Sequence, residues 1–280
     1  MTTPLIDCHA HFYPPNFSIS EIETILSSIQ DNGSNIRSII TVPETIEEAH
    51  QVLSLSKKYP MINPSAGLHP VQQTQTATGE SFARSATHTD LPPILDFIST
   101  HHESLTSIGE CGLDFSPHIL ATTHTGPIET QKEIQKSIFT SHITLAKSHS
   151  IPLNIHSRSA GHHAISLLRE HNAPPSLLHA FDGRPSHALN AVQLGHYLSI
   201  APIVVRSPQL QKLVQAVPLD HLVLETDSPA LCVEKGGRNT PLELEVACRE
   251  VARLKAVDVE EVRRITTENA RKLFTKLREV

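Results

Sequence analysis

Two histidines placed two residues apart, in the segment 5–11 (LIDCHAH), are the first side chains of this sequence that suit metal chemistry. Successive side chains of an extended strand alternate faces, so Asp7, His9 and His11 are expected to point the same way. Neutral imidazole nitrogen is a common ligand of divalent metals, and Asp7 is placed to fix an imidazole tautomer. His-x-His alone is a weak signal, because the chain has 19 histidines.

Position strengthens the signal, because the other candidate ligands also lie at or near the C-terminal ends of expected strands. These candidates are His69, Glu110, His156, His179 and Asp227. In a (β/α)8 barrel the strand ends share one rim, where active sites are built. The pattern therefore predicts one metal site at this rim, with most of the other histidines on the surface.

Eight strands that alternate with helices are expected along the chain. Apolar runs predict strands at residues 4–11, 37–43, 62–70, 104–112, 151–156, 176–181, 197–200 and 222–227. Helical spacing of apolar residues predicts helices at 19–31, 45–58, 91–102, 128–148, 160–171, 186–194, 209–216, 241–254 and 258–277. This alternation predicts an α/β fold with a parallel sheet, and eight strands close a TIM barrel. With no repeat or linker, residues 1–280 are expected to form a single domain.

Two polar segments, 71–89 and 116–127, are expected to be long loops after the third and fourth strands. That placement puts them on the active face, either as mobile or as functional loops. The segment 32–34 (NGS) predicts a turn that closes the first helix.

Composition limits the class of protein. The chain of 280 residues is 39% hydrophobic with only 4% aromatics, so the barrel interior is expected to consist of Ile, Leu, Val and Ala. The net charge of −6 argues against a broad nucleic-acid platform, although a metal site can still bind a polyanion locally. Dispersed cysteines and the lack of a signal peptide or membrane span indicate a cytoplasmic or nuclear protein that is not secreted. No membrane or protein partner is indicated.

The ligand chemistry favours two divalent ions. His9, His11 and Asp227 are expected to hold the first ion, and His156 and His179 the second. Glu110 is placed to bridge them, because one carboxylate can give an oxygen to each metal. Such a pair activates water and favours hydrolysis. The ligand types leave Zn, Mg and Mn open, and no dinucleotide or P-loop motif supports redox or kinase chemistry.

Seven motifs, in order, resemble those of the TatD-type hydrolases of the amidohydrolase superfamily. They are D-x-H-x-H at 7–11, G-x-H-P at 67–70, G-E-x-G-L-D-F at 109–115, P-x-x-x-H-x-R at 152–158, H-x-F-x-G at 179–183, L-E-T-D-x-P at 224–229 and T-x-N-A-x-x-L-F at 267–274. One departure is R-N-T-P at 238–241, where the family often has R-N-E-P. The missing acid bears on contacts in that loop and leaves the metal ligands intact.

The resemblance implies a metal-dependent deoxyribonuclease with a TIM barrel, typically exonucleolytic. Its metal ligands map onto His9, His11, Glu110, His156, His179 and Asp227. It further implies substrate or accessory-metal contacts at His69, Arg158 and Glu225.

For several of these residues a purely structural role is an alternative to a functional one. Arg158 is suited to clamp a phosphate, and its alternative is a surface ion pair at a helix entry. Glu225 is alternatively an internal partner of an Arg or Lys. Asp114 is expected to be a simple turn acid. Cys8 alternates away from the ligands and is expected to be a core thiol.

The leading functional hypothesis is a phosphodiesterase that acts at DNA ends, with Asp227 as general base and Glu110 as metal bridge. One alternative is a D-aminoacyl-tRNA deacylase, or another ester or amide hydrolase on the same site. Another alternative is a non-catalytic scaffold, which the intact ligand set argues against.

Overall fold

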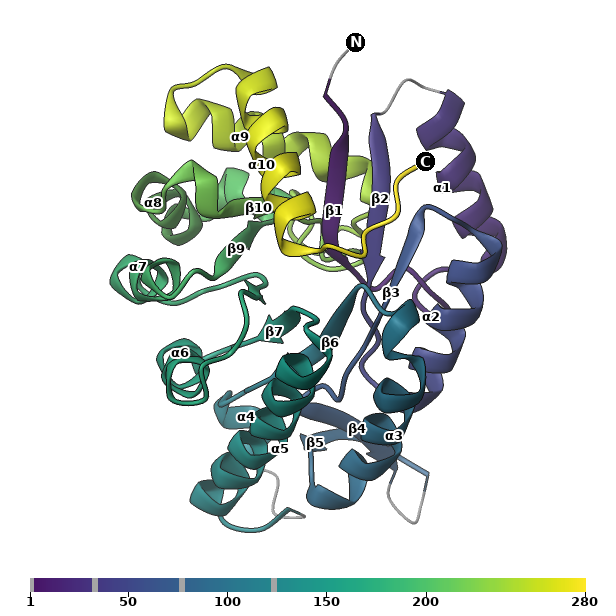
Figure 1. Cartoon of the computed structure of the whole chain (residues 1–280), viewed down its shortest axis with the longest axis vertical. Helices are drawn as coiled ribbons and strands as arrows, with labels where there is room; N and C mark the ends of the chain where they lie inside the picture. Colours follow the sequence, from purple (N-terminus) through teal and green to yellow (C-terminus); the bar gives the residue numbers. More distant parts are fainter. Residues whose placement is uncertain (1–2, 32–34, 76–78, 122–124) are drawn as a thin grey trace.

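The computed structural model describes residues 3–31, 35–75, 79–121 and 125–280 of the chain. Eight parallel strands form a nearly closed barrel, with helices around it, so the expected (β/α)8 architecture is confirmed (Figure 1). The strands, in their order around the sheet, are β1 (Leu5–Ala10), β2 (Ile36–Thr41), β3 (Ile62–Ala66), β6 (Ser107–Gly112), β7 (Leu153–His156), β8 (Leu177–Leu178), β9 (Tyr197–Ile200) and β10 (Leu222–Leu224).

The helices are close to the predicted ranges. They are α1 (Ile19–Asp31), α2 (Ile46–Lys58), α3 (Leu91–His101), α4 (Pro117–Leu120), α5 (Ile128–His149), α6 (Gly161–Glu170), α7 (Pro185–Gln193), α8 (Pro208–Ala216), α9 (Leu244–Lys255) and α10 (Val259–Leu273). The start of α2 is a capping box, in which Glu48 N donates to Thr45 Oγ1 and Thr45 N donates to Glu48 Oε2. Local sequence thus sets where this helix begins.

The expectation of two irregular loops on the active face is wrong in part. Residues Val71–Gln75 (β4) and Ser81–Ser85 (β5) pair as an antiparallel hairpin, which lies at the end of the barrel away from the start of β1 (Figure 1). The second segment contains the short helix α4. Parts of both loops, and the turn expected at 32–34, lie outside the described residues.

Several of the predicted strands end early, among them the strand expected at 62–70, which stops at Ala66 and leaves His69 beyond it. The strand expected at 176–181 is limited to Leu177–Leu178, and the strand expected at 222–227 stops at Leu224. His179 and Asp227 therefore lie beyond the ladder, and Asp227 has a left-handed backbone with φ 51°. Side-chain direction there no longer follows strand alternation, which is why the two acids at 225 and 227 face different neighbours.

The barrel interior is polar near the rim. His9 Nδ1 lies 2.8 Å from Asn154 Oδ1, and Asn154 Nδ2 donates to the Cys8 carbonyl at 2.9 Å. Because β1 and β7 are not neighbours in the sheet, these bonds cross the interior. The expectation that the barrel interior consists of aliphatic side chains is therefore wrong near the rim. Cys8 is a fully buried core thiol on the opposite face, as expected.

Gly109 makes room for Asn154. A Cβ at Gly109 would lie 2.8 Å from the Asn154 Cβ and would also clash with the Asn154 carbonyl oxygen. Real side chains do not approach so closely, so only glycine fits between β6 and β7 here. Gly109 therefore leaves the space in which Asn154 contacts His9.

Asp7 joins the two ends of the sheet. Thr226 N donates to Asp7 Oδ1 at 2.9 Å and Thr226 Oγ1 donates to Asp7 Oδ2 at 2.6 Å. Just above, Asp227 N donates to the His9 carbonyl and His11 N donates to the Ser228 carbonyl. Burial raises the pKa of Asp7 to about 8. The expectation that Asp7 fixes an imidazole tautomer is wrong, because its partners are Thr226 and a backbone N–H.

Within the described residues, no helix combines the length and the apolar character that crossing a membrane requires. The cytoplasmic or nuclear location stays a prediction.

Thr226→Val should weaken closure of the barrel. It removes the hydroxyl that donates to buried Asp7 but keeps the side-chain shape, so we expect the free energy of unfolding to fall by about 1–3 kcal/mol. Urea unfolding at fixed metal concentration measures this. Thr226→Ser, which keeps the hydroxyl, is the matched control and should lose clearly less stability. Equal losses in the two variants would contradict the role of the hydroxyl.

Candidate metal centre

One carboxylate oxygen of Glu110, at the end of β6, faces three imidazoles. Glu110 Oε1 lies 2.8 Å from His156 Nδ1, 2.8 Å from His179 Nε2 and 3.6 Å from His69 Nε2. Glu110 is 1% exposed, so this contact set is shielded from water. The structure thus brings together candidate ligands from β6 and β7 and from the segments that follow β3 and β8, which the sequence pattern predicted for one rim.

The other oxygen of Glu110 faces a second group. Glu110 Oε2 lies 3.3 Å from His11 Nε2 and 3.6 Å from His9 Nε2. Asp227 Oδ1 lies 3.5 Å from each of the same two nitrogens. Ligand atoms of His9, His11 and Asp227 are all within 4.8 Å of one another, which is close enough to share one ion. Glu110 therefore stands between two sets of metal-type side chains.

The histidines of β1 are held so that Nε2 faces the carboxylates. His11 Nδ1 lies 3.0 Å from the Val42 carbonyl, which can only accept, so Nδ1 carries the hydrogen. His9 Nδ1 is held in the same way by Asn154 Oδ1. The Nε2 lone pair of His9 is thus left free for a metal, as is usual for ligating histidines, whereas His11 has to give up its Nε2 hydrogen when a metal binds. Asn154 was not singled out in the sequence, because its role depends on a contact across the barrel.

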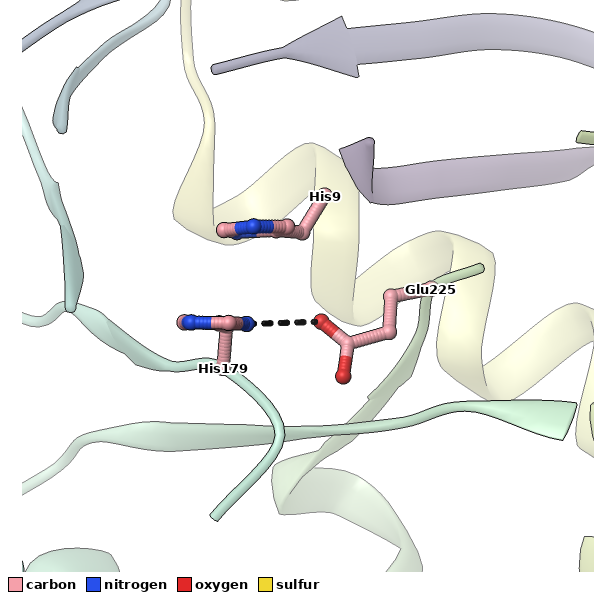
Figure 2. A group of neighbouring side chains, drawn as sticks. All are labelled: His9, His179 and Glu225. Atoms are coloured by element: carbon pink, nitrogen blue, oxygen red, sulfur yellow. Dashed lines mark ion pairs between the residues drawn. The ribbon is translucent and has the colours of Figure 1, made fainter. Parts of the chain in front are cut away.

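Glu225 lies behind His179. The rings of His9 and His179 are stacked, with centroids 3.7 Å apart. Figure 2 shows this stacking and the Glu225 carboxylate directed at His179. Glu225 Oε2 is 3.7 Å from His179 Nδ1 and accepts from the Ser199 hydroxyl, while Oε1 accepts from the Ala180 N–H. Neither an Arg nor a Lys partner is present among these contacts. Full burial suits a group that orients His179 and does not suit substrate contact, while accessory-metal contact stays a prediction.

Asp114 fixes the other side of His156. Asp114 Oδ2 lies 3.0 Å from His156 Nε2, and Asp114 Oδ1 accepts from the Ser116 N–H at 2.8 Å. The carboxyl is 2% exposed. The expected turn acid is present, since Asp114 accepts from the backbone two residues on, but Asp114 also contacts His156, which the sequence did not predict. Its place four residues after Glu110, inside the motif at 109–115, was the available signal.

His69 and Arg158 lie at the edges of the centre. His69 belongs with Glu110 and His156 to a group of potential ligand atoms, and its ring packs edge-on to that of His156. The preceding residue, Leu68, donates its N–H to buried His142 of α5, an exception to the expected surface histidines. Arg158 is exposed beside His156 and lines a neighbouring cavity, so a phosphate contact stays a prediction.

Glu44 is a further carboxylate that sequence reasoning missed. It follows β2, and its side chain groups with those of His11 and Glu110 within the distance that a shared ion requires. Its carbonyl accepts from the His69 N–H at 3.1 Å, which ties the ends of β2 and β3 together. An acid directly after the expected strand 37–43 was the signal, but no histidine motif accompanied it.

Burial and the neighbouring charges shift the pKa values of Glu110 and His11 in opposite directions. Burial acts to raise the pKa of Glu110, but the histidines around it hold that pKa well below the ordinary value. Burial lowers the pKa of His9 to about 3, so this imidazole is neutral and able to ligate. For His11 burial acts in the same direction, but Asp227 and Glu110 raise its pKa to about 9. The Glu110 carboxylate is thus ionised.

The side chains fit a divalent cation. Among the described residues, the buried side-chain atoms without a hydrogen-bond partner include His9 Nε2 and Glu110 Oε2. Buried polar atoms are nearly always paired, so two such atoms that face each other across 3.6 Å indicate a missing cationic partner. Imidazole nitrogen and carboxylate oxygen are donors that Zn, Mn and Mg accept to different degrees.

Known proteins resemble this chain over nearly its whole length. The model of the family described as TatD-related DNase matches residues 6–275. A human protein named deoxyribonuclease TATDN3 is 42% identical over 275 residues, which cover 98% of this chain and 96% of the human protein. A Bacillus subtilis protein, YabD, named an uncharacterized metal-dependent hydrolase, is 29% identical and covers 96% of this chain and 98% of its own length.

Solved structures show the same fold. The Escherichia coli TatD homologue YjjV superposes with a TM-score of 0.80 at 23% identity, covering 98% of this chain and 99% of that chain. At this identity the likeness concerns the fold alone.

Asp114→Asn should weaken metal binding, because Asp114 orients the imidazole of His156. The amide keeps the shape of the carboxyl but loses the charge that orients the imidazole, so we expect metal affinity to fall about 10- to 100-fold. Competition with a chromophoric chelator measures the affinity. Asp220→Asn, at an exposed acid paired with His221 on the surface, is the control. Unchanged metal affinity in Asp114→Asn would remove Asp114 from the centre.

Proposed function

The chain belongs to the family of TatD-related DNases, and from this membership we propose that residues 1–280 form one hydrolase domain that cleaves phosphodiester bonds at DNA ends. The chain is a metal-dependent hydrolase. What we propose beyond that is the substrate, the number of ions and the role of each residue.

The division of the ligands around Glu110 carries the proposal. One Glu110 oxygen faces His156 and His179, and the other faces His9 and His11. Carboxylates that serve two ions have this relation to their neighbours. We infer that His9, His11 and Asp227 hold one ion, that His156 and His179 hold the other, and that Glu110 bridges them. When bound, two such ions supply an activated water and stabilise charge on the phosphate.

Asp227 is the residue that we assign to proton transfer. Burial acts to raise its pKa, but the hydrogen bond from His11 and the nearby histidines lower it, so the carboxylate is ionised. Its Oδ1 faces His9 and His11, at the end of the seam between β10 and β1. An ionised carboxylate there can take the proton that an attacking water gives up. His69, which is near Glu110 and His156, and Arg158, which lines the cavity with His156, would bind the phosphate.

The charge of the protein supports attack at an end. With a net charge of −6 the chain lacks the broad positive field that holds long nucleic-acid tracts. Binding energy must then come from the metal centre and its few neighbours. A terminal phosphodiester needs only such local contacts.

One assay tests the substrate class. End-labelled single-stranded DNA and a D-aminoacyl-tRNA are incubated in parallel with the metal-free protein to which Zn, Mg or Mn is added. We expect release of nucleotides from the DNA end and no deacylation. Deacylation alone would replace the proposal with the ester-hydrolase alternative, and inactivity toward both, with metal bound, would favour a scaffold.

Treatment with a chelator should abolish hydrolysis but leave the fold. The ligands lie at the rim, whereas the clusters of buried apolar residues hold the strands and helices together. Far-UV circular dichroism should therefore change little, and added metal should restore activity. Unfolding on chelation would show that the ions are also structural.

Glu110→Ala should cost more metal than His9→Ala. The bridging carboxylate faces both ligand sets, whereas His9 shares its ion with His11 and Asp227. Mass spectrometry under native conditions counts the ions per chain. We expect both ions to be depleted in Glu110→Ala and chiefly one in His9→Ala. Full occupancy in Glu110→Ala would show that Glu110 is not the bridge.

Asp227→Asn should fold and bind DNA but turn over slowly. Asn keeps one oxygen for a metal and cannot take a proton, so we expect a rate loss of about 10² to 10⁴, the range for a lost general base. Single-turnover hydrolysis and DNA binding are measured on the same variant, with the metal content determined in parallel. A wild-type rate with both ions present would remove Asp227 from proton transfer.

A further inference from the structure

A cavity of about 240 Å³ opens beside the metal centre. Two of the ligands, His156 and His179, form part of its lining, so the cavity and the centre are continuous. Ser199 of β9 and Ala201, which directly follows that strand, are buried and also line the cavity. A group attached to a phosphate at the metal centre can therefore enter this cavity.

The cavity has aliphatic sides. Ile203 comes from the 3₁₀ helix Pro202–Arg206, Leu210 from α8, and Leu231 from the segment after β10. All three are partly exposed, as expected for side chains that line an open space. Leu231 is held in a left-handed conformation with φ 50°, a strained backbone that is typical of functional sites.

The mouth is polar. Arg158, Asp182 and Gln209 are exposed and line the same cavity, and Gln209 Nε2 donates to the Asp182 carbonyl. This bond ties α8 to the segment that follows β8. The mouth therefore offers a guanidinium and a carboxylate next to an aliphatic slot.

We propose that this cavity binds one unstacked nucleobase of the nucleotide next to the scissile phosphodiester, an inference that rests on the proposed function. A base has two apolar faces, which suit Ile203, Leu210 and Leu231, and polar edges, which suit Asp182 and Gln209. Arg158 is then next to the phosphate of the same nucleotide. The cavity is smaller than the pockets of drug-sized ligands, so it has room for one ring system and no base pair.

A specificity follows from this geometry. A base can enter only after it has left its stack and its partner, which costs least in a single strand. The cavity therefore selects single-stranded or frayed ends over the interior of a duplex.

The test compares two single-stranded oligodeoxynucleotides, one normal and one with base-free tetrahydrofuran residues at both ends. For the wild-type protein we expect the normal ends to be cleaved about tenfold faster or more, the scale for burying one ring. Ile203→Trp fills the cavity and should bring this ratio close to one. Val205→Trp, in the same 3₁₀ helix but 40% exposed and outside the lining, is the control and should keep the ratio.

A binding measurement separates this proposal from the proposed function. Thymidine 5′-monophosphate and 2-deoxyribose 5-phosphate are titrated calorimetrically into the metal-loaded protein, and the nucleotide should bind about tenfold more tightly. Base-dependent binding without DNA hydrolysis would overturn the proposed function and keep the cavity. Hydrolysis or binding with no preference for the base would overturn the cavity proposal. If Ile203→Trp does not fold, Ile203→Ala, which removes one side of the slot, should reduce the preference several-fold, and an unchanged preference would count against the cavity.

Discussion

The buried carboxylate of Glu110 is the constraint on which the rest of the centre depends. Removing a carboxylate from water costs several kcal/mol unless charges and hydrogen bonds replace the lost solvent. Here imidazoles on, or shortly after, four other strands surround it, and each is held by a partner behind it. Those partners include Asn154 for His9 and Glu225 for His179. The polar residues inside the barrel thus stabilise the Glu110 carboxylate at its rim, because they hold the histidines that surround it.

The same centre lies at the seam where the sheet closes. Asp7 binds Thr226 across the gap between β1 and β10, and Asp227 binds the backbone of His9 just above. The ligand pair on β1 and the carboxylate after β10 are therefore positioned by the contact that completes the barrel. A change at this seam should affect folding and metal binding together, since both depend on the register of these ends.

In the function that we propose, recognition of DNA and hydrolysis are divided between two neighbouring spaces. The metal centre is built from charged and imidazole groups that a phosphate can meet, whereas the adjoining cavity has aliphatic sides and a polar mouth. An acidic protein has little long-range attraction for nucleic acid. Local complementarity, of the metal ions for phosphate and of the cavity for a base, is a means of binding DNA without a positive surface.

The sequence by itself determined the barrel and most of the centre. Strand alternation places His9 and His11 on one face, and the rule that strand ends share a rim brings Glu110, His156 and His179 to them, because both rules depend only on backbone geometry. Tertiary structure decided the supporting contacts. Asn154 and Asp114 act through bonds between distant segments, which no local pattern encodes. It also decided that Glu225 faces His179 while Asp227 faces His11, because β10 ends at Leu224 and the backbone then turns left-handed.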